Sequence, residues 1–547
     1  MLGHQSNLKH LHLIEMRITN TSYTFALFVL GMSQTGFAQQ KTKRPNVLFI
    51  MTDQQRWDAM RCAGNLGIKT PNVDRIAREG VQFTNAYSAC PVSVPARTAI
   101  LTGRTIFNNK VLNNNDVESD SVPTHPTFDQ VLAENGYRTE YYGKWHSPYQ
   151  FATKYKNEVK TTNKDKHAKN VQSNVDAFRQ YLTEKFGAAR KPNANELIDF
   201  MSLRPYVALQ VDGRYGTVQQ FDANGKPSKS NGDSQANNIG IFHSQTDASL
   251  AAFEGHEALT ALKAIPANQA FSLTCSFGPP HPPFIAPKEY ADMYDIEKIE
   301  LPLSINDELK NAPYTQSSQV ADARFKNPVM VKQLKWVYYA MVTQVDDLVG
   351  KLLDELDNKG IANNTIVVFV SDHGELLGDH GLVSKNKMYE GSVHIPLLIR
   401  YPKVIQAGKK VDTPVSHHDI FATIMDYTGM KIPENDGRSL RNLINGKKDA
   451  IDYAVSTWGA INNGGPFMIR KGDWKMIVYL QMGEKKQKNI NALYNLKSDP
   501  LEMNNLIGSN PDKAKYSDVA TELKQTLKNW MIKTKTPYII ELDKTTL

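Results

Sequence analysis

The chain has 547 residues, of which 41% are hydrophobic and 9% aromatic, and its formal net charge at pH 7 is +8. This length predicts two domains, and the apolar content is that of a globular protein. The positive charges are spread along the chain and no nucleic-acid-binding motif is present, so we expect anionic small molecules or glycans as partners and no nucleic acid. The three cysteines, Cys62, Cys90 and Cys275, have neither the spacing of a metal cluster nor the number needed for a disulfide framework.

The N-terminal region contains the short apolar segment Tyr23–Met32, "YTFALFVLGM", which cannot span a bilayer. Gly36 and Ala38 follow it and supply the small residues of a cleavage site. The sequence therefore predicts a secretory signal peptide over residues 1–38 and a periplasmic or secreted mature chain, whose net charge is +7. A buried N-terminal strand is the alternative. We expect no membrane span in the mature chain, because no other apolar stretch is long enough.

Four unbroken apolar runs predict central strands of a sheet that is covered on both faces. They lie at residues 44–51, 270–277, 364–375 and 395–402. Helical patterns separate them, and the longest covers residues 331–360, with an apolar stripe and a glycine just past its end. Strands that alternate with helices predict an α/β sandwich with a large, mostly parallel sheet.

Two later regions have a different composition. Residues 151–240 are rich in Lys, Asn and Ser, which predicts a long irregular insertion, either a solvated excursion or a wall of a substrate cleft. After residue 446 the apolar runs become shorter and alternate, which predicts a small antiparallel sheet followed by a helix over residues 518–533. We therefore expect a large domain over residues 39–445 and a C-terminal subdomain over 446–547.

The stretch from Ala89 to Arg104, "ACPVSVPARTAILTGR", contains two candidate nucleophiles. Cys90 and Ser93 stand three residues apart, just before a Pro-x-Arg and a Leu-Thr-Gly-Arg. The alternative is a proline-rich loop that leads into a helix and buries a cysteine. These residues alone leave both interpretations open.

Two pairs of polar residues stand where two of the predicted strands end. Asp53 and Gln54 follow the first strand, and the apolar part of the third stretch, residues 364–375, ends at Asp372 and His373. Active residues in open α/β sheets gather at the carboxyl ends of the strands. Hard cations such as Ca²⁺ prefer clustered oxygen ligands, so the two pairs together predict a divalent metal site. A turn or a helix cap is the alternative for each pair taken alone.

Basic residues in three further segments are candidate site residues. Lys144 and His146 follow a short strand-like run, and in an extended segment they would point the same way. His281 lies in the proline-rich loop "FGPPHPPFIAP" directly after a predicted strand, and Lys385 and Lys387 precede the strand near residue 395. The alternative for each of them is a structural or solvent-exposed side chain.

Taken together, these stretches resemble the sulfatase family of the alkaline-phosphatase superfamily. The resemblance is carried by "RPNVLFIMTDQQR", "TPNVDRIAREGVQFTNAYS", "GYRTEYYGKWH", "SDHGELLGDHG" and "LYNLKSDPLEMNNL". Family members have a Cys or Ser followed by x-Pro-x-Arg and then Leu-Thr-Gly-Arg, a pattern that begins here at Ser93, whereas Cys90 lies three residues too early. The resemblance implies an alkaline-phosphatase-like sandwich with a smaller C-terminal subdomain. It also implies that Ser93 is the nucleophile, after oxidation to formylglycine.

The resemblance also implies the roles of the other candidates. The implied ligands of Ca²⁺ or Mg²⁺ are Asp53, Gln54, the modified Ser93, Asp372 and His373. The implied catalytic residues are Ser93, Arg97, Lys144, His146, His281 and Lys385. In the family pattern, the residue at Arg97 steadies the nucleophile and metal, and the pair at Lys144 and His146 binds the hydrate and takes its proton. The pair at His281 and Lys385 contacts the sulfate and the leaving oxygen. Lys387 is the alternative to Lys385. We also expect a helix that starts near Arg97 and directs its amide dipoles at the anion.

The sequence departs from the family pattern at three of these positions. Many members have a second acid where Gln54 stands and Asn where His373 stands, so the ligand set is a hypothesis. His394 stands where many relatives have Arg before a proline, which leaves the adjacent specificity pocket undefined.

The resemblance, the signal peptide and the positive charge together predict an exported sulfatase. We expect it to hydrolyse sulfate esters of a sulfated polysaccharide or its oligosaccharides, after maturation by a serine-converting, formylglycine-generating enzyme. One alternative is a phosphodiester or phosphonate monoester hydrolase on the same scaffold. The other is an inert glycan-binding protein in which Ser93 stays unconverted.

Overall fold

The computed structural model describes residues 44–118, 125–149, 246–314, 326–459, 464–481 and 490–547, and short pieces at 178, 180–181, 184–185, 198–200 and 239–242. Residues 45–547 form one compact unit. The signal peptide expected over residues 1–38 and most of the insertion expected over 151–240 lie outside the described residues. Among the residues that are described, no helix combines the length and the apolar character needed to cross a membrane.

The largest sheet has seven strands in the order β12-β2-β11-β9-β1-β7-β4. Neighbours β9, β1, β7 and β4 run parallel, whereas β11 runs antiparallel to both β9 and β2. The sheet is therefore mixed and mostly parallel, as the sequence predicted. The strands are β1 (Asn46–Thr52), β2 (Val81–Phe83), β4 (Arg138–Gly143), β7 (Phe271–Phe277), β9 (Thr365–Ser371), β11 (Leu397–Arg400) and β12 (Lys409–Val411).

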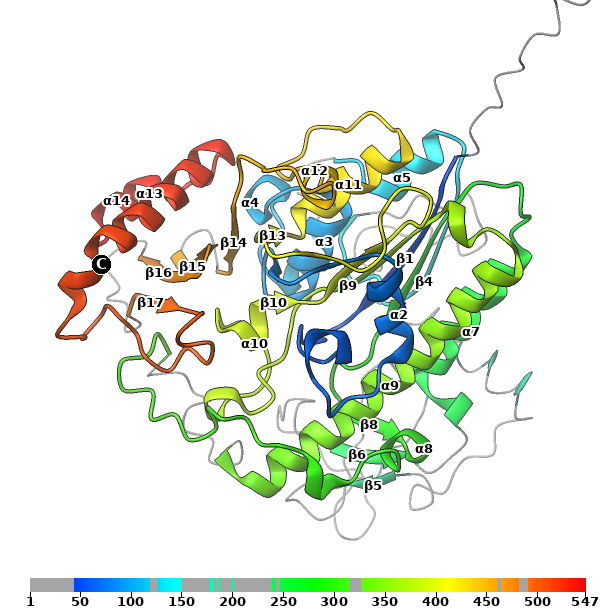
Figure 1. The fold of residues 1–547 in the computed structure, drawn as a ribbon, viewed down its shortest axis with the longest axis horizontal. Helices are drawn as coiled ribbons and strands as arrows, with labels where there is room; N and C mark the ends of the chain where they lie inside the picture. The colour runs from blue at the N-terminus through cyan, green and yellow to red at the C-terminus, as the bar shows by residue number, and fades with distance from the viewer. Residues whose placement is uncertain are drawn as a thin grey trace, which may run out of the picture. The chain divides into compact units, whose positions relative to one another are not determined.

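Helices cover both faces of this sheet, which explains its unbroken apolar strands. In β1, Phe49 packs with α3 (Ser93–Thr102), α5 (Phe128–Glu134) and α11 (His418–Thr428) on one face. The next residue, Ile50, points to the other face. It packs there with α2 (Pro71–Glu79), α7 (Leu250–Ala264) and α9 (Pro328–Asn358). Figure 1 shows α7 and α9 on one side of the strands and α3 and α11 on the other.

The apolar run predicted as one strand over residues 395–402 is divided between two sheets, so that prediction was wrong at its start. Residues His394–Ile395 form β10, which pairs with β3 (Ala86–Tyr87) in a three-stranded sheet that also contains β13 (Val415–Ser416). Only Leu397–Arg400 joins the large sheet as β11. Pro396 stands at the break, where its missing N–H interrupts the ladder.

The C-terminal residues form a four-stranded antiparallel sheet in the order β14-β15-β16-β17. Its strands are Tyr453–Thr457, Gly464–Lys471, Trp474–Gln481 and Ala492–Asn495. Helices α13 (Ser517–Lys533) and α14 (Ile539–Lys544), red in Figure 1, share its core on one face. The predicted antiparallel sheet and helix are thus confirmed, while the domain boundary at residue 446 stays a prediction.

The remaining elements are short. A further three-stranded sheet consists of β5 (Ile198–Phe200), β6 (Ile239–Phe242) and β8 (Phe284–Pro287). The short α-helices are α4 (Ile106–Asn109), α8 (Lys288–Ala291), α10 (Glu390–Val393) and α12 (Arg441–Ile444).

The longest helix, α9, carries a buried carboxylate that caps another helix. Asp346 accepts hydrogen bonds from the backbone amides of Asn72, at 3.1 Å, and Val73, at 2.7 Å. These amides belong to the first turn of α2, where a helix has no intrahelical acceptor for them. Asp346 therefore anchors the start of α2 to α9 on one face of the large sheet.

We predict that Asp346→Ala lowers the free energy of unfolding by about 1–3 kcal/mol, because it leaves buried amides without an acceptor. Asp346→Asn is the matched control, since its single amide oxygen still accepts a hydrogen bond and the loss should be smaller. Urea denaturation of the three proteins measures both effects. Equal stability of Asp346→Ala and the wild type would contradict this account of the α2–α9 contact.

Candidate active site

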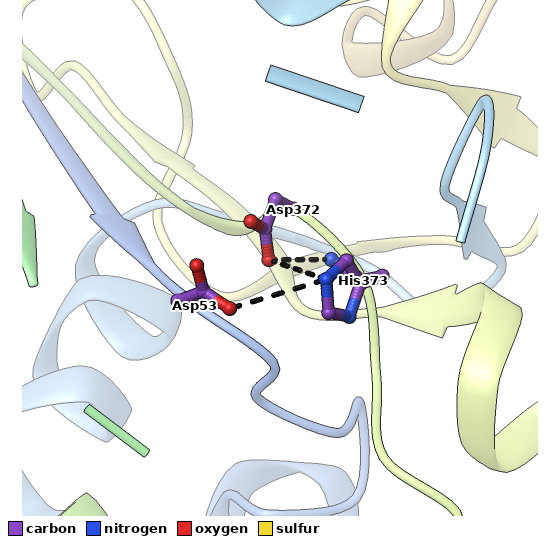
Figure 2. A group of neighbouring side chains, drawn as sticks. All are labelled: Asp53, Asp372 and His373. Atoms are coloured by element: carbon purple, nitrogen blue, oxygen red, sulfur yellow. Dashed lines mark hydrogen bonds and ion pairs between the residues drawn. The ribbon is translucent and has the colours of Figure 1, made fainter. Parts of the chain in front are cut away.

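Three of the predicted metal ligands meet where β1 and β9 end. The two strands are parallel neighbours with Thr52 opposite Ser371, so the residues that follow, Asp53 and Asp372, lie side by side. Figure 2 shows both carboxylates and the imidazole of His373 pointing toward one another. One ligand atom from each of the three lies within 4.8 Å of the others, and all three side chains are fully buried. The geometry follows from the register of the sheet.

A guanidinium joins the two carboxylates. Arg97 Nε donates to Asp372 Oδ2 at 2.8 Å, and an Nη donates to Asp53 Oδ2 at 3.1 Å. The Arg97 side chain has no solvent exposure. Burial opposes its charge, but the two carboxylates raise the pKa of Arg97 above its usual value. Arg97 is therefore a permanent cation between the ends of β1 and β9.

Helix α3 begins at Ser93, whereas the sequence predicted a start near Arg97. The earlier start places Ser93 and Arg97 one turn apart on the same face of the helix, so both reach the same site. It also changes the expected role of the helix amides. The Val94 amide donates to Asn114 Oδ1 at 3.1 Å, and Pro95 has no N–H. The backbone of Val94 and Pro95 therefore has no N–H available for an anion. At these two residues α3 can attract an anion only through its helix dipole.

The structure separates the two candidate nucleophiles. Ser93 Oγ lies 3.0 Å from His373 Nε2 and 3.4 Å from Lys385 Nζ. His373 Nδ1 lies 3.0 Å from the Gly374 carbonyl, which only a protonated Nδ1 can bind, so the lone pair of Nε2 faces the site. Cys90 instead packs in an apolar cluster with Val92, and burial raises the pKa of its thiol.

The two candidate lysines of the loop after β9 point to different places. Lys385 Nζ donates to Gln54 Oε1 at 2.8 Å, and burial lowers the pKa of Lys385 to about 8. Lys387 Nζ lies 5.4 Å from the centre of the Tyr314 ring and donates to Asn386 Oδ1 at 2.9 Å. Of the two, only Lys385 contacts the cluster around Ser93.

The site holds its carboxylate ionised and its imidazole neutral. Burial alone would raise the pKa of Asp53, but Lys144, His281, Arg97 and Lys385 together hold it well below its usual range. Lys144 Nζ forms a direct ion pair with Asp53 Oδ2. Burial lowers the pKa of His373 to about 4. A carboxylate oxygen and an unprotonated imidazole are the forms that bind a cation.

The two remaining candidate histidines lie on loops, His281 after β7 and His146 after β4, and of the two the electrostatic contacts place His281 beside this cluster. His281 Nδ1 is 2.7 Å from the Pro282 carbonyl, and burial, Lys385 and Lys144 hold the pKa of His281 well below its usual value. His146 is half-buried, with a φ of 47°. Strand β4 ends at Gly143, so strand alternation, the reason given from the sequence, does not align Lys144 with His146.

The backbone at Gly143 and Lys144 makes several close contacts with its neighbours. The Lys144 carbonyl accepts from Arg97 at 2.7 Å, Ser276 Oγ at 2.8 Å and Tyr141 OH at 2.6 Å. Gly143 has a φ of +91°, and a Cβ there would lie 2.0 Å from the Ser276 carbonyl oxygen. Only glycine fits this position.

Two residues that the sequence analysis missed brace the cluster. His417 is fully buried, and its Nδ1 accepts from the Ala89 amide at 3.2 Å while its Nε2 donates to the Ser371 carbonyl at 3.0 Å. Glu375 accepts a hydrogen bond from Gln54 Nε2. Glu375 follows Asp372, His373 and Gly374 directly, so its place near the site could be inferred from the sequence, whereas nothing near His417 in the sequence indicates its contacts.

His394, the third departure from the family pattern, has a packing role. Its ring stacks between Trp57, with centroids 4.5 Å apart, and Tyr87, at 5.0 Å. Its Nδ1 lies 2.9 Å from Glu390 Oε2, and its Nε2 lies 2.9 Å from the Thr84 carbonyl. Each ring nitrogen therefore faces an oxygen atom of the protein.

Comparison with known proteins identifies the family. Residues 45–430 match the sulfatase family, and residues 378–533 match the C-terminal region of N-sulphoglucosamine sulphohydrolase. The chain belongs to the sulfatase family. It is a sulfuric ester hydrolase of the alkaline-phosphatase superfamily, and the resemblance found in the sequence is confirmed.

Individual relatives cover nearly the whole chain. An arylsulfatase of Clostridium perfringens is 28% identical over 85% of this chain and 91% of its own length. An N-acetylglucosamine-6-O-sulfatase of Bacteroides thetaiotaomicron is 28% identical over 89% of this chain and 86% of its own. The solved phosphonate monoester hydrolase of Agrobacterium radiobacter shares the fold, with a TM-score of 0.67, 22% identity, and coverage of 90% of this chain and 96% of that one.

We predict that Gly143→Ala abolishes most sulfatase activity, because the new Cβ collides with the Ser276 carbonyl and displaces Lys144. Gly360→Ala is the matched control: Gly360 also has a positive φ, +64°, but nothing lies within 4 Å of the point that a Cβ would occupy there. Its cost should be limited to about 1–2 kcal/mol of backbone strain, with normal turnover. Turnover and thermal unfolding of both variants measure the difference, and equal losses would argue against a special role of the close contact.

Proposed function

We propose that this sulfatase is exported, binds one Ca²⁺ or Mg²⁺, and uses a formylglycine made from Ser93 to hydrolyse sulfate esters of glycans. One observation carries the proposal: Ser93 Oγ lies within 3.4 Å of both His373 and Lys385, beside the carboxylates that Arg97 joins. Nucleophile, cation ligands and anion-binding groups thus share one buried cluster.

The residues present fit a hard divalent cation. Asp53 Oδ1 is buried and accepts no hydrogen bond from any described residue, although the other oxygen of the same carboxylate binds two cations. An ionised oxygen without a donor is costly unless a cation occupies the space beside it. Asp53, Gln54 and Asp372 supply oxygen atoms and only His373 supplies nitrogen, a donor set suited to Ca²⁺ or Mg²⁺. The modified Ser93 would complete the ligand set.

When bound, the cation would withdraw charge from the sulfate oxygens and help to ionise the nucleophile. Arg97, Lys144 and Lys385 form the positive wall of the site and bind the anionic ester. His281 is the proposed general acid. Its Nδ1–H is held by the Pro282 carbonyl, so Nε2 must first take up a proton, a form that the bound anionic ester would favour, and then pass that proton to the departing alcohol. His146 is the proposed base for the nucleophile.

Formylglycine would be a better nucleophile here than serine, which has a single, weakly nucleophilic hydroxyl. Its hydrated aldehyde carries two hydroxyls, one to attack sulfur and one to expel sulfate afterwards. The position of Ser93 in Ser-x-Pro-x-Arg, one helical turn before Arg97, supports this assignment.

We predict that a native preparation contains formylglycine at residue 93. Mass spectrometry of the Ala89–Arg97 peptide should show the loss of two hydrogens relative to serine. Protein produced in a host without a serine-converting enzyme should fold but be largely inactive, as should Ser93→Ala, which serves as the control. A fully active protein with unmodified serine would overturn the formylglycine assignment.

Three observations support a glycan substrate. One relative is named for N-acetylglucosamine 6-O-sulfate, and the C-terminal family match is to an N-sulphoglucosamine sulphohydrolase. The net charge of +8 for the whole chain favours a polyanion. The expected signal peptide would bring the enzyme to the periplasm or the medium, where large polymers are met.

We predict that kcat/KM for sulfated oligosaccharides far exceeds that for a small aryl sulfate, because contacts remote from sulfur lower the barrier. A panel of sulfated oligosaccharides, assayed for released sulfate beside an aryl sulfate and a phosphonate monoester, tests this. Equal kinetics on oligosaccharide and aryl sulfate would leave a small-molecule sulfatase as the better description. Faster turnover of the phosphonate would favour the alternative hydrolase.

A further inference from the structure

The side chain of Gln54 lies between an anion and a cation. Its Nε2 donates to Glu375 Oε2, and its Oε1 accepts from Lys385 Nζ at 2.8 Å. The backbone amide of Gln54 donates to Asp372 Oδ1 at 3.0 Å, in a left-handed conformation with a φ of 68°. The amide group therefore has one orientation in which both of its ends are satisfied.

Glu375 is held by backbone amides with its second oxygen directed at Gln54. Its side chain is buried, with 1% exposure, and its Oε1 accepts from the backbone amides of Leu377, at 3.1 Å, and Ser384. Its remaining oxygen faces the Gln54 NH₂ group. Glu375 Oε2 accepts from the nitrogen of the Gln54 amide, and on the other side Lys385 Nζ, which can only donate, faces the amide oxygen. The amide oxygen must then face the opposite side, toward Lys385.

We propose that Glu375 is a positioning residue that selects the oxygen of Gln54, rather than its nitrogen, as the atom presented to the cation. This inference rests on the proposed metal site. A flipped amide would present an NH₂ group, which cannot bind a cation. Metal ligands depend on outer hydrogen-bond partners of this kind for their orientation.

The same pairing explains why an amide occupies this position. A carboxylate at residue 54 would place an oxygen against Glu375 Oε2 and would have no N–H to donate to it. With glutamine at residue 54, the neutral amide donates its NH₂ group to Glu375 and presents its oxygen to the side of the proposed cation. Gln54 and Glu375 thus form a donor–acceptor pair, in which the amide donates and the carboxylate accepts.

The pairing is tested by exchanging the two groups in a double-mutant cycle. The proteins are the wild type, Glu375→Gln, Gln54→Glu and the double variant Gln54→Glu/Glu375→Gln. Calcium and magnesium titrations of the metal-stripped proteins give dissociation constants without any assay of activity. Glu375→Gln should weaken binding by about 10–100-fold, because its NH₂ group turns the Gln54 amide around. The double variant restores an acceptor–donor pair and should bind at least about tenfold more tightly than the product of the single effects predicts.

Two controls separate failure of this inference from failure of the metal site. Asp372→Ala should abolish binding, and a wild type that binds neither ion, or an Asp372→Ala that still binds, would overturn the metal site itself. Glu140→Gln changes another buried carboxylate, which pairs with Arg138 and Tyr142, and should leave metal affinity unchanged. Thermal unfolding of the metal-free variants shows whether each is folded.

Two outcomes would overturn the positioning role while the metal site stands. One is a folded Glu375→Gln protein with wild-type affinity for both ions. The other is a double variant whose affinity equals the product of the two single effects.

Discussion

The active site depends on one buried guanidinium. Arg97 contacts the carboxylates that follow β1 and β9 and the carbonyl that follows β4, so one side chain joins three ends of the large sheet to helix α3. Loss of one partner from a buried ion pair leaves an uncompensated charge, at a cost of about 3–5 kcal/mol. The position of Ser93 follows from this contact, because it lies one helical turn before Arg97.

The charged groups of the proposed site favour the binding of an anion. Three cations, Arg97, Lys144 and Lys385, face the carboxylates of Asp53, Asp372 and Glu375, and the proposed divalent ion would make the site positive. Burial, together with repulsion from Lys144, lowers the pKa of Lys385 to about 8. A sulfate ester would relieve that repulsion, so part of the energy that binds the ester comes from the arrangement of the cations themselves.

Much of this arrangement could be predicted from the sequence because it follows local rules. Unbroken apolar runs correctly indicated β1, β7 and β9, and the residues after β1 and β9 were expected at one edge of the sheet, where parallel strands end; they meet because the two strands are neighbours. The family resemblance indicated Ser93 rather than Cys90 and Lys385 rather than Lys387. Ser93 and Lys385 lie in the buried cluster, whereas Cys90 packs among apolar side chains and Lys387 against Tyr314; the catalytic roles stay predictions.

Other features could not be predicted, because they depend on contacts between residues far apart in the chain. His417 bonds to Ala89, 328 residues away, and Glu375 bonds to Gln54, 321 residues away. No periodicity or spacing marks such pairs. The division of residues 395–402 between two sheets was missed for a similar reason: Pro396 was a visible signal, but β10 had a partner of its own in β3. Local sequence specifies which residues form strands more reliably than which strands pair.

The C-terminal sheet completes the scaffold of the site, although it supplies none of the proposed catalytic residues. The Thr457 amide, at the end of β14, donates to the Ala89 carbonyl at 3.1 Å, four residues before Ser93. In β16, Lys475 is fully buried and lies 2.7 Å from carboxylate oxygens of both Glu390 and Glu502. Glu390 begins α10, directly after the loop that carries Lys385. The sheet therefore braces the segment of the nucleophile through a backbone hydrogen bond and the segment of Lys385 through buried ion pairs. Since removing one member of a buried ion pair is costly, the large sheet and the C-terminal sheet depend on each other for the geometry of the site.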